Sequence, residues 1–269
     1  MNRRFSEVDY SYVDAFNTWM EKGNLSGNTR VYYLKRLCSI FNKAIKSKQA
    51  NTSNYPFGKN GFIISSLATQ TSKRYMPTEY LESLKNKEAS TPQKEYARQL
   101  FLLSYYCYGI SFKDMALLKS KNIVEYNDGK YIIYKRLKTQ EKNTKAISIK
   151  ITDTISSIIH SLSAYKQPYS DYLLPIVTKP NDTSEELQIQ INTALGLYNR
   201  YLKSLAKEFN FNMGLSSYVS RHTTAMQLQQ KGIPEHIISQ MLGHKRLETT
   251  KVYLDSIDNS VIDQAVKVL

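Results

Sequence analysis

The stretch QMLGHKRLETTKVYLDSI, residues 240–257, combines residue types that are well suited to chemistry. It places His244 directly after Gly243, two threonines at 249–250, and a single tyrosine, Tyr253, at fixed spacing. An imidazole can transfer a proton near neutral pH, and a phenol can act as a nucleophile that forms a covalent intermediate. The chain contains 21 tyrosines, most of which should simply pack, so the spacing alone leaves open whether Tyr253 packs or reacts.

The charge of the chain indicates the kind of partner it binds. The 269 residues include 37 Lys and Arg against 23 Asp and Glu, which gives a formal net charge of +14 and a pI near 9.5. A polyanion or an acidic surface is therefore the expected partner. A membrane is the weaker candidate, because there is no run of 18 or more apolar residues, no apolar stretch near the start and no basic amphipathic helix.

The cysteine and histidine content argues against a disulfide framework and against a metal site. Cys38 and Cys107 lie far apart in apolar helical patterns, which fits a reducing cytoplasm. Two cysteines and four scattered histidines do not have zinc-ligand spacing. We expect the chemistry to need neither a metal nor a cofactor.

The first segment of the chain is predicted to be helical. Ser26 can cap a helix with one apolar face, and the rest of that helix is largely basic. The apolar residues are Val31, Leu34, Leu37, Cys38, Phe41 and Ile45, and the basic ones are Arg30, Lys35, Arg36, Lys43, Lys46 and Lys48. Asn, Ser, Pro and Gly accumulate over residues 48–62, which predicts a connector, and we place a domain boundary near residues 70–77.

The second segment is predicted to be mainly helical around one small sheet. Thr91 and Pro92 have the residue types that begin helices, and the apolar run at 100–110 predicts a buried helix. In residues 122–151, β-branched and aromatic residues alternate with polar ones around Asp128-Gly129, which predicts a three-stranded antiparallel sheet. The fold class is therefore mainly α with a small antiparallel β-sheet.

Three motifs occur in an order that resembles a known family. RLKT at 136–139 is followed by SSYVSRHTTA at 216–225 and LGHKRLETTKVYLD at 242–255, as in the catalytic domain of tyrosine recombinases, the phage-integrase family. The chain is most similar to integrases of conjugative and mobilisable elements. The resemblance extends more loosely to SGNTRVYYLKRL at 26–37, which is similar to the helical core-binding domain of that family. It implies a helical DNA-clamp domain at residues 1–72 and a catalytic domain at 73–269.

The resemblance implies a role for each motif. Tyr253 is the nucleophile that would hold the DNA 3′ phosphate while the 5′ hydroxyl departs, so that neither ATP nor a metal is needed. Arg221 is the second arginine of the phosphate clamp, and His244 stands at the position that donates to the phosphate or the leaving group. Lys138 would protonate the departing oxygen from a β-hairpin, with a merely solvated basic hairpin as the alternative. His222 is expected to be structural.

Two residues depart from the family pattern. Ser111 stands where the first clamp arginine belongs, if Asp114 takes the acidic position, and Tyr218 stands where the pattern HxxR begins with His. We expect Arg136 to substitute, because on a strand it would share a face with Lys138, although a plain backbone-phosphate contact is an equal alternative. Tyr218 can donate a hydrogen bond but titrates too high to act as a base near neutral pH. Asp114 either orients a pocket arginine or helix, or is a helix-surface carboxylate.

The predicted function is site-specific strand exchange on double-stranded DNA, integrating or excising a mobile element, in the cytoplasm at the nucleoid. The terminal helix at 259–269 would dock on its own domain or on a neighbouring protomer, and a tetramer on DNA, with possible host DNA-bending proteins, is expected. The chain leaves no room for an arm-binding domain, so it is a short member or a fragment. A catalytically weakened DNA-binding relative and a type IB topoisomerase are the alternatives. The predicted DNA-contacting residues are Arg30, Lys35, Arg36, Lys43, Lys135, Lys142 and Lys245.

Overall fold

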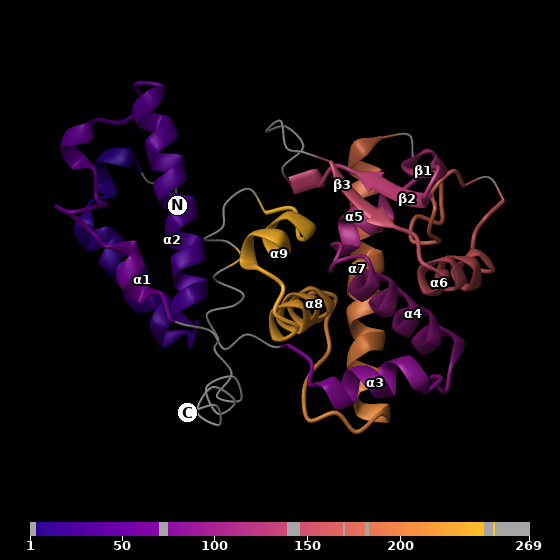
Figure 1. Ribbon diagram of the computed structural model, residues 1–269. Helices are drawn as coiled ribbons and strands as arrows, with labels where there is room; N and C mark the ends of the chain where they lie inside the picture. Colours follow the sequence, from indigo (N-terminus) through magenta and orange to yellow (C-terminus); the bar gives the residue numbers. More distant parts are fainter. Residues whose placement is uncertain are drawn as a thin grey trace. The chain divides into compact units, whose positions relative to one another are not determined.

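The computed structural model describes residues 4–69, 75–138, 146–168, 170–180, 183–244 and 250. The chain divides into two compact units, Met1–Ser72 and Lys73–Leu269 (Figure 1). Each unit contains its own hydrophobic core. Helices predominate and the described strands form one small antiparallel sheet, so the predicted fold class is confirmed.

The first unit is built on two α-helices whose starts are capped by side chains. Its elements are η1 (Phe5–Glu7), α1 (Tyr10–Lys22), α2 (Gly27–Lys46), η2 (Thr52–Asn54) and η3 (Ile64–Leu67). The Ser26 hydroxyl accepts from the Thr29 amide, so the predicted cap of α2 is confirmed. The connector after α2 does more than link elements, because Phe57 and Phe62 are buried in the same core as Leu34.

The second unit is organised around α4, whose side chains are buried on most of its faces. Its helices are α3 (Thr78–Asn86), α4 (Pro92–Tyr106), α5 (Phe112–Ala116), η4 (Ser120–Asn122), α6 (Asp153–Ser163), α7 (Ser184–Glu208), α8 (Val219–Gln230) and α9 (Glu235–Met241). Thr91 caps α4 and Pro92 occupies its first turn, as predicted. Because α4 packs against α3, α6, α7 and α8, it fixes the positions of the helices around it.

The sheet has the strand order β1-β2-β3, with β1 (Ile123–Tyr126), β2 (Gly129–Tyr134) and β3 (Ile147–Lys150), and both pairs are antiparallel. This confirms the predicted three-stranded sheet. The hairpin turn between β1 and β2 lies one residue earlier than the Asp128-Gly129 pair suggests. Tyr126 pairs with Gly129, so residues 127–128 form the loop. Gly129 takes a φ of +133° at the first position of β2, a conformation that glycine adopts readily.

The strand β2 ends at Tyr134, before the RLKT motif begins. Arg136 therefore lies on irregular backbone beyond the strand and Lys138 lies in a 3-10 helical turn, so the prediction that they share one face of a strand was wrong. The alternation of the hairpin does not continue past Tyr134. The positions of these two side chains are consequently set by tertiary contacts rather than by strand periodicity.

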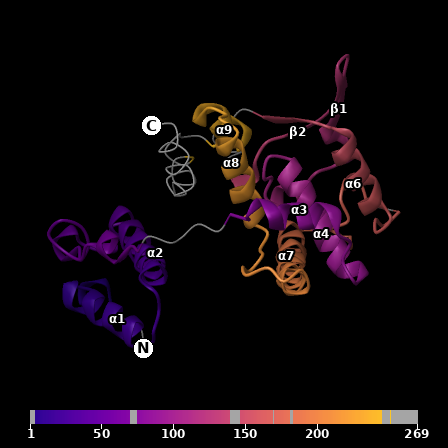
Figure 2. The same cartoon turned by 60° about the horizontal axis from the view of Figure 1, so that its bottom comes forward.

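Helices α8 and α9 lie side by side and form a small cluster of their own with Ala225, Met226, Ile238 and Leu242 (Figure 1, Figure 2). Buried hydroxyls attach α8 to the end of α4. The Oγ atoms of Ser104 and Ser220 are 2.8 Å apart, and the Thr224 hydroxyl donates to the Tyr105 carbonyl at 3.1 Å. This attachment fixes the first turn of α8, the part of the helix that carries Arg221. Among the described residues, no helix has both the length and the apolar character needed to cross a bilayer.

Candidate active site

Arg221 is the centre of a buried polar cluster. Its side chain projects from the first turn of α8, and the residue is only 3% exposed. Its Nη1 donates to the Gly109 carbonyl at 2.9 Å, and its Nη2 donates to the Leu242 carbonyl and lies 3.0 Å from Nε2 of His244. Gly109 has a φ of +66°, and a Cβ there would come within 2.6 Å of the Arg221 Cα. Glycine is therefore required where the chain after α4 passes Arg221.

His244 follows the C-terminal end of α9. Gly243 takes a φ of +62°, and the His244 amide then donates back to the Ser239 carbonyl at 2.9 Å, as in a glycine-terminated helix. A Cβ on Gly243 would lie 2.9 Å from Cδ of Arg136. The LGH sequence thus ends a helix at a point where two basic side chains pass close to the backbone.

Arg136 reaches the same backbone from the loop after β2. Its Nη1 donates to the Gly243 carbonyl at 3.2 Å and lies 3.5 Å from the Leu242 carbonyl oxygen. Its Nε is 3.9 Å from Oδ2 of Asp114, and the side chain is 15% exposed. The structure therefore brings Arg136, Arg221 and His244 into one cluster, although Arg136 does not lie on the strand that was predicted to carry it.

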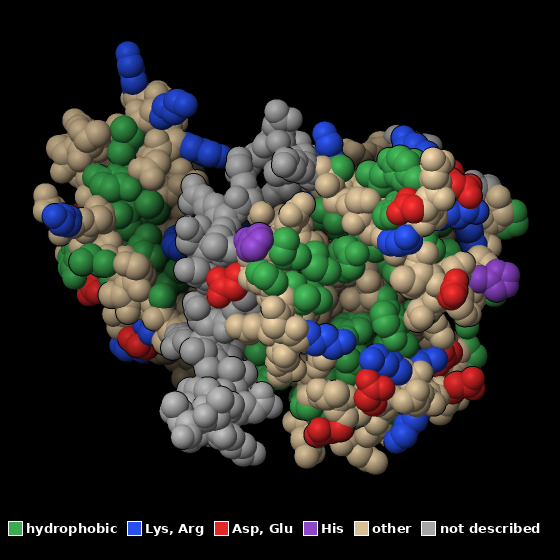
Figure 3. Space-filling model, viewed as in Figure 1, with side chains coloured by type: hydrophobic (Ala, Val, Ile, Leu, Met, Phe, Trp, Pro, Cys, Tyr) green, Lys and Arg blue, Asp and Glu red, His purple; other side chains and the backbone are tan. Residues whose placement is uncertain are grey.

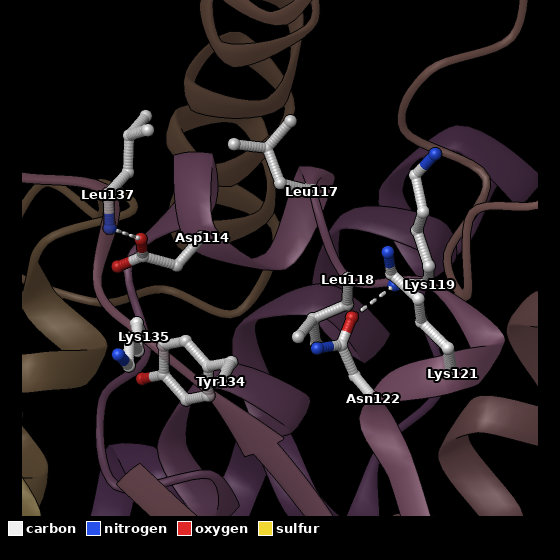
Figure 4. Close-up of a pocket in the computed structure, with 9 residues that line it drawn as sticks. All are labelled: Asp114, Leu117, Leu118, Lys119, Lys121, Asn122, Tyr134, Lys135 and Leu137. Atoms are coloured by element: carbon white, nitrogen blue, oxygen red, sulfur yellow. Dashed lines mark hydrogen bonds between the residues drawn. The ribbon is translucent and has the colours of Figure 1, made fainter. Parts of the chain in front are cut away.

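Asp114 is buried beneath this cluster and is hydrogen-bonded on both oxygens. Oδ1 accepts from the Leu137 amide at 2.8 Å (Figure 4), and Oδ2 accepts from the Ser111 hydroxyl at 2.7 Å. Ser111 in turn caps α5 by accepting from the Asp114 amide. Asp114 is 6% exposed, which argues against a helix-surface carboxylate and supports the alternative that it orients a neighbouring arginine or helix. Through Leu137 and Arg136 it fixes the loop after β2.

The electrostatic environment keeps the His244 imidazole neutral. Burial, followed by the positive charges of Arg221, Arg136 and Lys138, lowers the pKa of His244 from 6.5 to about 3. A guanidinium can only donate, so Nε2 of the neutral ring accepts from Arg221. The proton then resides on Nδ1, which lies 2.8 Å from the hydroxyl oxygen of Thr250. Burial also raises the pKa of Tyr134, which lines a pocket together with Asp114 (Figure 4).

Two further predicted site residues lie at the surface. Lys138 is exposed but close enough to lower the pKa of His244. Tyr218 stands at the start of α8, is 51% exposed, and its ring meets that of His222 edge to face at 4.9 Å between centroids. The nucleophile candidate Tyr253, together with Lys142, Lys245 and the predicted terminal helix, lies outside the described residues.

Most of the described residues that were predicted to contact DNA are exposed. Lys35, Arg36 and Lys43 are exposed on α2, where the Arg36 guanidinium lies 5.2 Å from the centre of the Tyr32 ring. Lys135 is also exposed, beside the pocket that contains Asp114 (Figure 4).

Arg30 differs from this group. It pairs with Glu21 at 2.9 Å, donates to Asn17 at 3.2 Å, and its side chain is 13% exposed. The structure thus assigns Arg30 to the contact between α1 and α2 rather than to the basic face. Its position four residues before Leu34, at the edge of the apolar stripe, was the sequence signal for this.

Sequence reasoning missed four contributors to the cluster. The Leu242 carbonyl accepts from both arginines and the Gly243 carbonyl accepts from Arg136, roles that residue types do not reveal. Gly109 is one of several glycines in the sequence, and only its approach to Arg221 distinguishes it. Thr250 was noted for its spacing but was given no role. Among the described residues, no group of three or more His, Cys, Asp or Glu is placed to hold a metal ion.

Comparisons with known proteins agree with the two-unit organisation. Residues 74–260 match the model of the phage integrase family, and residues 2–62 match that of the phage integrase SAM-like domain. Transposase B from transposon PsiTn554 of Staphylococcus aureus is 23% identical over 195 residues, covering 72% of this chain and 30% of that protein. A tyrosine recombinase of Pseudothermotoga lettingae is 27% identical over 112 residues, covering 42% and 38%. The chain thus matches about a third of the length of these relatives.

Solved structures show the same fold. The XerH site-specific recombinase bound to a palindromic difH substrate, in a post-cleavage complex, superposes with a TM-score of 0.70 at 17% identity, covering 96% of this chain and 72% of that one. The Tn1549 transposon integrase in complex with a circular intermediate DNA gives a TM-score of 0.61 at 15% identity, covering 98% and 86%. The predicted architecture, a helical domain followed by a mixed domain, is confirmed.

Proposed function

Because this chain belongs to the phage integrase family, we propose that it is a tyrosine-type site-specific recombinase that cuts and rejoins DNA through a 3′-phosphotyrosine intermediate. The observation that carries the proposal is that Arg221 and Arg136 both contact the Leu242 carbonyl, while Nε2 of His244 lies 3.0 Å from Nη2 of Arg221. Three nitrogen-bearing side chains in one buried cluster form a site for a single anionic group. Tyr253, nine residues after His244, is the proposed nucleophile.

In the proposed reaction, the Tyr253 oxygen forms a bond to phosphorus as the bond from phosphorus to the 5′ oxygen breaks. The phenol loses its proton to solvent, and Lys138 supplies a proton to the departing 5′ oxygen. A second DNA end reverses these steps, because its 5′ hydroxyl attacks phosphorus and the tyrosine leaves. The phosphodiester energy is stored in the phosphotyrosine, so rejoining needs no nucleotide cofactor.

Arg136 is proposed to take the place of the first clamp arginine. Ser111, the N-cap of α5, carries no positive charge, and its hydroxyl is committed to Asp114. Arg136 already lies near Asp114 and contacts the Leu242 carbonyl, which Arg221 also contacts. Charge builds up on the non-bridging oxygens in the transition state, and these oxygens are stronger acceptors for a guanidinium than a backbone carbonyl.

The first unit is proposed to hold DNA through the exposed basic face of α2, formed by Lys35, Arg36 and Lys43. On the face of the second unit visible in Figure 3, Lys and Arg are interspersed with Asp and Glu, so the positive excess does not form one continuous patch there. The two units would close around duplex DNA. The transposon and integrase names of similar proteins support a role in moving a mobile element, in assemblies of several protomers on DNA.

A DNA-binding protein with weakened catalysis is the second candidate, and Ser111 and Tyr218 motivate it. A suicide DNA substrate made from the end of the element separates the two. A covalent protein–DNA adduct that disappears in Tyr253→Phe supports the recombinase, whereas stable binding of the cognate end without an adduct supports the binder. Relaxation of supercoiled plasmid without site preference would instead indicate a type IB topoisomerase.

A further inference from the structure

Thr250 contacts the proposed phosphate site without belonging to any of its proposed catalytic groups. The residue is fully buried, and its Oγ1 lies 2.8 Å from Nδ1 of His244. It is also three residues before Tyr253 in the sequence. A buried hydroxyl at this distance from a ring nitrogen forms a strong and directional hydrogen bond.

Arg221 and Thr250 together determine which ring nitrogen of His244 carries the proton. Arg221 lies 3.0 Å from Nε2 and can only donate, so Nε2 must offer its lone pair. A neutral ring then has its hydrogen on Nδ1, where the Thr250 oxygen is the acceptor. If Thr250 were apolar, the Nδ1 hydrogen would be left in a buried site without this acceptor, and the ring would lose the contact that sets its rotation.

We infer that Thr250 is a positioning residue, which fixes the tautomer and the orientation of the His244 ring so that Nε2 faces Arg221 and the phosphate that both would share. The inference rests on the proposed function, because it concerns how His244 is prepared for that phosphate. A phosphate oxygen that enters between Nη2 of Arg221 and Nε2 of His244 meets a donor on one side. On the other side it meets Nε2 of His244. The negative charge of the phosphate raises the pKa of the ring, so that Nε2 takes up a proton from solvent and then donates to the phosphate oxygen.

Thr250 also connects the imidazole to the segment that carries the nucleophile. A hydroxyl held by His244 anchors the chain three residues ahead of Tyr253.

The first test measures the tautomer in the protein without DNA. The sequence has four histidines, so the ring nitrogen signals of a ¹⁵N-histidine-labelled sample can be assigned, with those of His244 identified by their loss in His244→Gln. The expected result near neutral pH is a protonated Nδ1 and an unprotonated Nε2. A proton on Nε2 in the wild type overturns the inference, and this readout does not depend on whether the protein cleaves DNA.

The second test measures adduct formation under single-turnover conditions on the suicide substrate. Thr250→Val keeps the shape of the side chain and removes the hydroxyl, and we expect the cleavage rate to fall about tenfold to a hundredfold while DNA affinity is retained. Thr250→Ser keeps the hydroxyl and is the matched control, expected to restore most of the rate. Equal losses in the serine and valine variants would show that packing matters rather than the hydrogen bond, and would overturn the inference.

A double-mutant cycle distinguishes positioning from general stability. If Thr250 acts through His244, Thr250→Val lowers the rate much less in a His244→Ala background than in the wild type. The same fold loss in both backgrounds would contradict action through His244. Should Thr250→Val fail to fold, the tautomer of His244 in the wild type and the cleavage rate of Thr250→Ser still decide whether Thr250 positions the His244 ring. Failure of the recombinase proposal itself would appear separately, as absence of any Tyr253-dependent adduct.

Discussion

Arg136 and Arg221 both direct a guanidinium nitrogen at the carbonyl oxygen of Leu242, although one lies on the loop after β2 and the other on α8. The Arg136 nitrogen is 3.5 Å from that oxygen, and a second contact to the Gly243 carbonyl at 3.2 Å holds it in place. Two like charges are kept close by this shared acceptor, with Asp114 balancing part of the charge. Such an arrangement leaves the site strongly attractive for an anion.

Replacing Arg221 by Ala is expected to abolish cleavage while DNA binding is retained. The guanidinium would stabilise charge that develops in the transition state, and losing one such donor typically lowers the rate by about 10²–10³. Adduct formation on the suicide substrate, measured beside a binding titration, checks this. Weakened binding with normal turnover would refute the clamp role.

Arg136→Ala is expected to lower the cleavage rate by more than it lowers affinity, because the proposed contact strengthens in the transition state. Lys130→Ala is the matched control. Lys130 is exposed on β2, its Nζ lies 3.9 Å from a carboxylate oxygen of Glu125, and it does not belong to the proposed site. Both variants lose one positive charge. If cleavage in Arg136→Ala falls only in proportion to affinity, Arg136 is a simple backbone contact and not the substitute clamp.

The alanine variant of Gly109 is expected to lose both stability and cleavage. A non-glycine residue at a φ of +66° costs about 1–2 kcal/mol, and the new Cβ would also collide with the backbone of Arg221. Gly232→Ala has a similar φ of +74° but nothing within 4 Å of the new Cβ, so it isolates the backbone cost. Urea unfolding of both variants checks the difference, and equal destabilisation would show that the collision is relieved without cost.

The pH dependence of stability should carry the signature of His244. Its pKa is about 3 in the folded protein against 6.5 for an unperturbed histidine, so between these values the unfolded chain binds the extra proton. The free energy of unfolding therefore falls as the pH drops from about 6.5 toward 3. His244→Gln removes this contribution and should flatten the dependence, as measured by urea midpoints at pH 7.5 and 5. If the urea midpoint changes between the two pH values by the same amount in His244→Gln as in the wild type, the ring is already charged in the folded state.

Binding to DNA should weaken steeply with salt, because phosphate contacts release counterions. Lys43→Ala on the exposed face of α2 is expected to weaken binding alike for all sequences and to reduce the slope of log affinity against log salt by about one. Titrations at several salt concentrations with cognate and random duplexes test this. A flat salt response of the wild-type protein would contradict a phosphate-dominated interface.

The sequence by itself determined the helices, the three-stranded sheet and the family. Helix caps such as Ser26 and Thr91, the apolar periodicity and the alternation of the strands are local properties of the chain, set within a few residues. The order of the three motifs likewise needs no folded structure. That Arg136 substitutes for the missing arginine stays a prediction, and the strand periodicity on which it was based ends at Tyr134.

Only the tertiary structure decided what the site residues touch. Arg30 is basic in the sequence like its neighbours on α2, yet it pairs with Glu21, and Thr250 became informative only through its contact with His244. The convergence of Arg136, Arg221 and His244 depends on how α8, α9 and the loop after β2 pack against one another. Such contacts join residues far apart in the chain, and their geometry follows from burial and hydrogen-bond satisfaction across the whole core, which no local spacing encodes.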